Sequence, residues 1–162
     1  MTAAMEAICG PLPLSVKAFY EIVGGIDLYG ANPDWDDFYD PLMVASGAET
    51  LQDLYDQRKW HEDEVQQGKP AQPFTLYYAP DPLAKEGMSS VGSNYVTAPF
   101  PAADAALWFE GGPIDVMFVQ SLRNAFQWGG FQVLVTPGSG FEADNPPPPT
   151  DLAALTAGFL PL

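Results

Sequence analysis

Residues 12–29 read Leu12-Pro-Leu-Ser-Val-Lys-Ala-Phe-Tyr-Glu-Ile-Val-Gly-Gly-Ile-Asp-Leu-Tyr29, and the order of signals within them decides the fold. Pro13 suits the first turn of a helix, where its missing N–H removes no hydrogen bond. Lys17 and Glu21 lie four residues apart and are predicted on the solvent side of this helix. The apolar residues at helical spacing predict one buried face, formed by Val16, Phe19, Ile22 and Val23.

Two glycines are predicted to end this helix and to begin a strand. Gly24 can adopt the left-handed conformation that ends a helix, and Gly25 permits a sharp exit. The next four residues, Ile26-Asp-Leu-Tyr29, alternate between apolar and polar as a half-buried strand does. A helix followed at once by a strand is therefore expected at this end of the chain.

The Leu-Pro pair, the aromatic-containing helix, the Gly-Gly stop and the strand together resemble the opening of the SUKH superfamily. Residues 118–131 and 155–162 resemble later helices of its members, so the resemblance covers under half of the chain. It implies one α+β domain in which a central antiparallel or mixed sheet packs against several helices. It also implies a mostly non-enzymatic function, because the superfamily includes many bacterial immunity proteins that neutralise toxins, often nucleases, and some regulatory proteins.

Length and charge limit the classes of protein to consider. A chain of 162 residues fits a single domain, and a hydrophobic fraction of 47% argues against disorder. Twenty-one acidic and six basic residues give a formal net charge of -15. Nucleic acids and anionic membranes both require a cationic surface, so neither is expected as a partner. A basic protein is the partner that the charge favours.

The single cysteine, Cys9, excludes an intrachain disulfide and favours a reducing compartment. We expect it to be a small, buried apolar residue. The first residues carry neither a basic nor an apolar leader segment, and no apolar run approaches the roughly 20 residues of a membrane span. These observations predict a cytoplasmic protein.

The middle of the chain contains a loop, a helix and two strands. Residues 31–41 are rich in Asn, Asp, Pro and aromatic residues and are predicted to form an acidic loop. Thr50, followed three residues later by Asp53, offers a capping box for a helix that runs to Gln67 and ends at Gly68. Strand-forming residues at 74–79 and 94–98 predict two strands of one antiparallel sheet.

The last third of the chain is predicted to hold one more central helix and several shorter elements. Residues 103–109 fit either a helical turn or an edge strand, and a strand at 107–109 is favoured. Asp115 is expected to cap a helix that is stopped by the Gly-Gly pair at 129–130. The side chains predicted to face inward on this helix are Phe118, Val119, Leu122, Ala125 and Phe126. A strand at 131–135, a Pro-rich spacer at 145–149 and a short C-terminal helix at 150–157 complete the single domain of residues 1–162.

Enzyme and metal motifs are scarce. His61 is the only histidine, so a metal site with several histidines is excluded and any catalytic triad would need this one ring. His61 lies in the polar segment 59–64, where an exposed histidine beside carboxylates is the simpler interpretation.

The alternation of Asn32, Asp34 and Asp36 resembles a calcium loop. That pattern fails where it needs glycine, since Asp37 stands there, and where it needs a twelfth-position acid, since Met43 stands there. We therefore assign no catalytic, cofactor-binding or metal-binding residue.

Acidic residues interleave with aromatic ones between Asp27 and Glu64. This stretch has eleven acidic residues against Arg58 and Lys59, which leaves nine of the fifteen excess negative charges within it. Large aromatics surrounded by carboxylates can anchor and steer a basic partner. The competing interpretation is that the acids only solvate the surface while the aromatics fill the core. The candidate partner-binding residues are Asp34, Trp35, Asp36, Asp37, Phe38, Asp40, Glu62, Asp63 and Glu64.

Three functions follow as hypotheses from the sequence. The first is a binding module of the SUKH type, such as an immunity protein whose acidic surface neutralises a basic nuclease-type toxin. The second is a regulatory or scaffolding domain of the same fold. The third is a small hydrolase that uses His61 or a pair of carboxylates.

Overall fold

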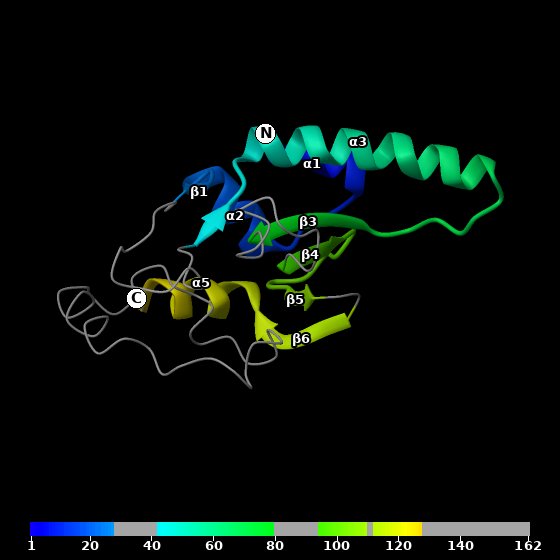
Figure 1. Ribbon diagram of the computed structural model, residues 1–162. Coiled ribbons are helices and arrows are strands. Elements are labelled where there is room, and N and C mark those ends of the chain that lie inside the picture. Colours follow the sequence, from blue (N-terminus) through cyan, green and yellow to red (C-terminus); the bar gives the residue numbers. More distant parts are fainter. Residues whose placement is uncertain (28–41, 80–93, 110–111, 128–162) are drawn as a thin grey trace, which may run out of the picture.

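The computed structural model describes residues 1–27, 42–79, 94–109 and 112–127 and has an α+β fold (Figure 1). Over these ranges, every helix is too short or too polar to cross a membrane. Some of the predicted elements lie outside the described residues. They are the acidic loop at 31–41 with its calcium-like pattern, the strand at 131–135, the spacer at 145–149 and the helix at 150–157. The elements in chain order are α1 (Thr2–Cys9), α2 (Leu14–Ile22), β1 (Ile26–Asp27), β2 (Met43–Val44), α3 (Gly47–Gln66), β3 (Phe74–Ala79), β4 (Asn94–Ala98), β5 (Ala106–Phe109), β6 (Gly112–Met117) and α5 (Phe118–Gln127).

The central sheet has four antiparallel strands in the order β3-β4-β5-β6. The strands predicted at 74–79 and 94–98 pair antiparallel as expected, with Leu76 opposite Val96. The strand predicted at 107–109 lies within β5. A separate two-stranded sheet joins β1 to β2. The α+β class and the antiparallel sheet expected from the sequence are confirmed.

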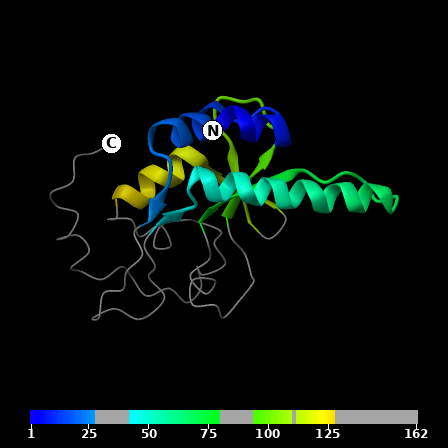
Figure 2. The ribbon, with the colours of Figure 1, turned by 90° about the horizontal axis from the view of Figure 1, so that it is seen from above.

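One face of the central sheet forms the hydrophobic core with the helices. Because side chains alternate along a strand, Leu76, Val96 and Leu107 point to the same face, and each is at most 2% exposed. Helix α3 contacts β3 and α1, whereas α5 contacts β6 and α2 (Figure 2). The helices contribute the remaining large core side chains, which include Met5, Val16, Phe19, Tyr20, Leu54 and Phe118.

The helix and stop predicted at residues 12–25 are confirmed, but part of the predicted buried face is wrong. Gly24 has a φ of 84° and its N–H donates to the Phe19 carbonyl, so it ends α2 as expected. Ile22 and Val23 are 83% and 54% exposed, because α2 ends there and leaves the core. Tyr20 is buried instead, and its ring packs edge-on against Phe19.

Helix α1 was not predicted. It contacts two side chains of α2 that were expected to face solvent. Lys17 Nζ lies 2.9 Å from Glu6 Oε2, and Thr2 Oγ1 donates to Glu21 Oε1 at 2.6 Å. These contacts attach α1 to α2. Lys17 and Glu21 therefore hold two helices together rather than only solvating one.

Helix α3 starts earlier than the sequence analysis placed it. Ser46 is its N-cap, and a capping box forms between Ser46 and Glu49, whose side chain accepts from the Ser46 N–H at 2.8 Å. These hydrogen bonds lower the pKa of Glu49. Thr50, predicted as the cap, lies inside the helix, and its Oγ1 is 3.0 Å from the Tyr20 hydroxyl in the core. The predicted end at Gly68, which has a φ of 80°, is confirmed.

The cap predicted for α5 is also wrong. Asp115 lies in β6, a strand that the sequence analysis missed, and its side chain is exposed. Asp104 takes the capping role from a distant position, since its Oδ2 accepts from the Val119 N–H at 3.4 Å. Its Oδ1 accepts from Ser15 Oγ at 2.6 Å and from the Ala105 N–H at 2.9 Å. Asp104 therefore joins α2 and α5 from a position just before β5.

The inward face predicted for α5 is largely correct. Phe118 and Ala125 are buried and belong to the core, and Val119 and Leu122 are half-buried against it. Phe126 is 37% exposed, so it does not extend the buried face as predicted.

Gln57 of α3 forms a two-point contact with the edge strand β3. Its Oε1 accepts from the Thr75 N–H at 2.8 Å, and its Nε2 donates to the Thr75 carbonyl at 2.7 Å. Nε2 also donates to Asp53 Oδ2 at 2.8 Å. Burial raises the pKa of Asp53. Both donors and the acceptor of the Gln57 amide are thus in use, and the backbone groups of Thr75 are satisfied by a side chain.

We expect Gln57→Leu to lower the free energy of unfolding by about 1–3 kcal/mol, because it leaves the backbone groups of Thr75 without these partners. Urea unfolding followed by circular dichroism measures the change. Gln57→Glu is the matched variant, since its carboxylate can accept from the Thr75 N–H but faces the Thr75 carbonyl with an oxygen. If both variants matched the natural chain, the contact would have no energetic role.

Candidate functional surface

The second half of α3 extends beyond the body of the domain (Figures 1 and 2). Leu54 anchors the first half in the core and is fully buried. Farther along the helix, Trp60 is 53% exposed and Val65 is 52% exposed. Val65 lies eleven residues after Leu54, which places it on the same side of the helix at 100° per residue. The side of α3 that packs against the core in the first half of the helix is therefore exposed in the second half.

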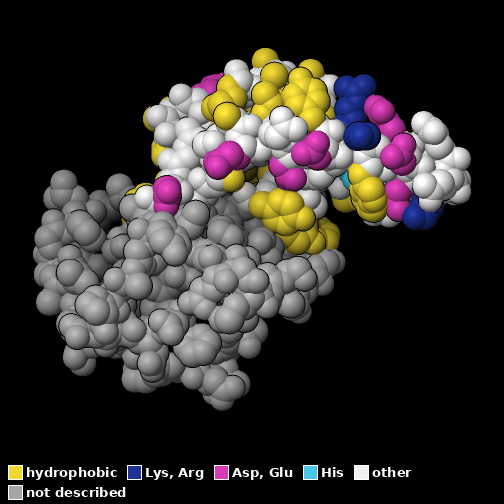
Figure 3. Space-filling model, turned by 45° about the horizontal axis from the view of Figure 1, so that its top comes forward, with side chains coloured by type: hydrophobic (Ala, Val, Ile, Leu, Met, Phe, Trp, Pro, Cys, Tyr) yellow, Lys and Arg dark blue, Asp and Glu magenta, His cyan; other side chains and the backbone are white. Residues whose placement is uncertain are grey.

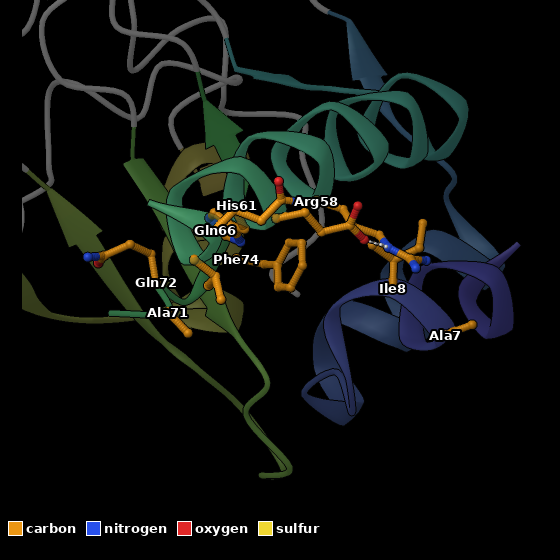
Figure 4. Close-up of a pocket in the computed structure, with 10 residues that line it drawn as sticks. Ala7, Ile8, Arg58, His61, Gln66, Ala71, Gln72 and Phe74 are labelled. Atoms are coloured by element: carbon orange, nitrogen blue, oxygen red, sulfur yellow. Dashed lines mark hydrogen bonds and ion pairs between the residues drawn. The ribbon is translucent and has the colours of Figure 1, made fainter. Parts of the chain in front are cut away.

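An open groove of about 650 Å³ lies beneath this extended part of α3 (Figure 4). Helix α1 forms one wall, α3 forms the roof, and the segment leading into β3 forms the other wall. The lining is largely apolar, with polar groups toward the α3 side. The groove is lined by Ala7, Ile8, Arg58, His61, Glu62, Val65, Gln66, Ala71, Gln72 and Phe74.

His61 is half-buried and faces this groove rather than lying on a fully exposed helix face. Its ring packs against Phe74 with centroids 4.7 Å apart and against Trp60 with centroids 5.3 Å apart. Arg58 Nε lies 2.9 Å from Glu62 Oε1 on the same helix. Serine, threonine and cysteine are not found among the ten described lining residues. The surroundings of His61 are therefore aromatic and ionic, without a neighbouring nucleophile in the described lining.

The three predicted acidic residues on α3 have different surroundings. The Glu62 side chain is 58% exposed and pairs with Arg58, whereas the Glu64 side chain is 12% exposed and bonds to Lys69 Nζ at 2.6 Å. Asp63 is exposed, and no cation within the described ranges pairs with it. Asp63 is thus the most available of the three. The other candidate residues, Asp34, Trp35, Asp36, Asp37, Phe38 and Asp40, lie outside the described residues.

The surface of α3 combines negative charge with exposed apolar groups. The segment Gly47–Gln66 holds six acidic and two basic residues, which gives a net charge of -4. Figure 3 shows acidic side chains interspersed with exposed hydrophobic ones over this side of the molecule. A surface of this kind attracts cations over distance and offers apolar area for contact.

Cys9 is buried as expected. It is 2% exposed, and its Sγ donates to the Met5 carbonyl at 3.2 Å. Burial raises the pKa of Cys9 to about 11, so the thiol stays protonated at neutral pH. Within the described part of the chain, no group of three or more His, Cys, Asp or Glu residues is placed to hold a metal ion.

Sequence reasoning missed the groove because it missed α1, which supplies one wall. A signal was present, since Thr2, Met5 and Cys9 are buried at helical spacing and Ile8 packs beside them. The groove side of α3 gave no comparable signal, because Arg58 and His61 are typical of a solvated helix face.

A scan against protein-family models finds no match, and searches of curated proteins and of solved structures find no significant similarity. Function is therefore inferred from the chemistry of the described surface.

Proposed function

We propose that this chain is a non-enzymatic protein-binding module that presents the extended half of α3 to a basic protein partner. The observation that carries the proposal is the exposure of Trp60, Asp63 and Val65 on the part of α3 that extends past the core and over a groove. Tryptophan is the residue type most enriched among the energetic anchors of protein interfaces. A half-exposed Trp60 is therefore suited to be buried by a partner.

Charge supports a basic partner. The net charge of -15 and the net -4 of α3 attract a cationic protein and speed its association at low salt. Asp63, which has no ion-pair partner among the described residues, offers a carboxylate for a new ion pair. Glu62 already has Arg58, and Glu64 already has Lys69, so these two contribute mainly to the overall field.

The groove favours contact over catalysis. Its apolar lining, which includes Ile8, Val65 and Phe74, suits an apolar side chain from the partner. His61, the residue on which a hydrolase hypothesis depends, packs against Phe74 and Trp60. Hydrolysis through His61 would need a nucleophile or an activated water from outside the described lining.

An immunity protein of the SUKH type is the specific form of this proposal. It draws on the resemblance of residues 12–29 and on the excess of acidic residues, since a nuclease-type toxin needs a cationic groove for nucleic acid. The acidic α3 surface would occupy the nucleic-acid groove of the toxin. This proposal places both proteins in the cytoplasm. A regulatory or scaffolding domain of the same fold is the alternative, and it predicts that no toxin is encoded beside the gene.

We expect Trp60→Ala to weaken binding of a basic toxin encoded beside the gene at least tenfold, because it removes the largest exposed anchor. Calorimetric titration at two salt concentrations measures the affinity. Tyr55→Ala is the matched control, since Tyr55 is 51% exposed but lies on the anchored half of α3; its effect should be under twofold.

Asp63→Lys should slow association and reduce its salt dependence in the same titration. Equal loss in the Trp60 and Tyr55 variants would contradict the assignment of this surface. If no basic protein encoded in the neighbourhood binds, the immunity function fails and the regulatory alternative stands.

A further inference from the structure

The sheet face opposite the core carries a row of three aromatic side chains, which we call the aromatic row: Tyr77 of β3, Tyr95 of β4 and Trp108 of β5. Tyr95 is directly opposite Tyr77 in one strand pair and Trp108 in the next. The ring centroids of Tyr77 and Tyr95 are 6.2 Å apart, and those of Tyr95 and Trp108 are 6.3 Å apart with nearly parallel planes. The three rings therefore form one continuous strip across three strands.

The aromatic row is open to solvent in a way that the core face is not. Tyr77 is 47% exposed, and Tyr95 and Trp108 are half-buried. Leu76, Val96 and Leu107, which are next to them along the strands and point to the other face, are at most 2% exposed. The row thus offers apolar ring faces together with groups that can donate hydrogen bonds, two phenol hydroxyls and an indole N–H.

We propose that the aromatic row binds a polyproline II segment, and that its occupant is the proline run of this same chain at 146–149. Proline-rich segments bind aromatic-lined surfaces because the polyproline II helix is already extended and loses little entropy on binding. Its carbonyl groups make no internal hydrogen bonds, so they can accept from Tyr hydroxyls and an indole N–H.

The dimensions of the row fit this occupant. A polyproline II helix rises about 3.1 Å per residue, so four prolines span about 12 Å. The two centroid separations of 6.2 and 6.3 Å, taken end to end, give a strip of the same length. The run Pro-Pro-Pro-Pro at 146–149 lies outside the described residues and is flanked by Asn145 and Thr150.

The connecting chain is long enough for this contact. Residues 128–145 separate the end of α5 from the prolines, and such a stretch can extend to roughly 60 Å. Four strands spaced about 4.8 Å apart are much narrower than this reach. A tether also holds the prolines at an effective concentration on the order of millimolar, so a weak intrinsic affinity is enough for occupancy.

The test compares the natural chain with a full-length variant in which residues 146–149 are replaced by Gly-Ser-Gly-Ser. The probe is a synthetic peptide with the sequence of residues 142–151, and a second peptide with four alanines in place of the prolines is its control. Binding is followed by NMR at the indole N–H of Trp108, which is identified by Trp108→Phe. We expect the variant to bind the proline peptide saturably and the natural chain to bind it at least tenfold more weakly.

Four outcomes would overturn the proposal. Failure of the proline peptide to shift the Trp108 signal in the variant, or equal binding of the alanine peptide, would show that the row does not recognise polyproline II. Equal affinity for the natural chain and the variant would assign the row to a separate proline-rich partner. A Trp108 signal of the natural chain that moves on dilution would assign it to a second copy. The unfolding midpoint of the variant, compared with that of the natural chain, confirms that the fold is retained.

Discussion

Replacing Leu54 by alanine is expected to lower the free energy of unfolding by about 2–5 kcal/mol. Leu54 is fully buried and is the residue of α3 that enters the core most deeply. Its truncation removes buried apolar surface and leaves a cavity beneath the helix, and both effects destabilise the folded state. Urea unfolding followed by far-ultraviolet circular dichroism measures the difference.

Val65→Ala is the matched control for this prediction. Val65 lies on the same side of α3 but is 52% exposed, so its truncation should change the free energy of unfolding by no more than about 0.5 kcal/mol. A loss at Val65 equal to that at Leu54 would mean that the end of α3 is packed as tightly as its start. The groove proposed as a contact surface would then be filled in solution.

Asp104→Ala should lower the free energy of unfolding by about 2–4 kcal/mol. The carboxylate accepts from Ser15 Oγ and from the backbone N–H groups of Ala105 and Val119. Hydrogen bonds to a charged group are stronger than neutral ones, and removing the acceptor leaves partly buried donors unpaired. Thermal and urea unfolding of the variant measure the loss.

Two further variants make this prediction specific. Asp104→Asn keeps one oxygen for Ser15 and Ala105 but presents N–H to the α5 terminus, so its loss should be intermediate. Asp115→Ala alters the residue that the sequence marked as the cap, and it should change stability by no more than about 0.5 kcal/mol because that side chain is exposed. A larger loss at Asp115 than at Asp104 would restore the sequence-based assignment.

The sequence correctly predicted those elements that depend on the conformational preferences of their own residues. Gly24 and Gly68 adopt positive φ values, and each ends its helix where the sequence placed the end. The strands at 74–79 and 94–98 are rich in β-branched and aromatic residues, which favour the pleated surface of a sheet. Local chemistry is sufficient for such elements.

Predictions failed where a tertiary partner decides the role of a residue. Thr50 is a residue type that can cap a helix, but in the structure it is buried. Its hydroxyl is hydrogen-bonded to that of Tyr20, thirty residues away in sequence. Ser46 carries the same chemistry four residues earlier and is the true cap. Asp115 is predicted as the cap because it lies just before α5 in sequence, whereas a cap needs only to be adjacent in space.

The candidate surface shows the same division. The acidic character of 62–64 was visible in the sequence, but which carboxylate stays unpaired depends on where Arg58 and Lys69 place their side chains. The groove depends on α1, and the aromatic row depends on strand register. Pairing of Tyr77 with Tyr95 and of Tyr95 with Trp108 follows from the register in which the separate strands hydrogen-bond to each other.

The side-chain amide of Gln57 affects whether another strand can pair with the edge strand β3. An edge strand with free backbone groups is a template on which a foreign strand can assemble, and this is a common route to aggregation. Gln57 occupies both backbone groups of Thr75, so an incoming strand would have to displace it before extending the sheet. At this position the natural chain resists polymerisation through β3.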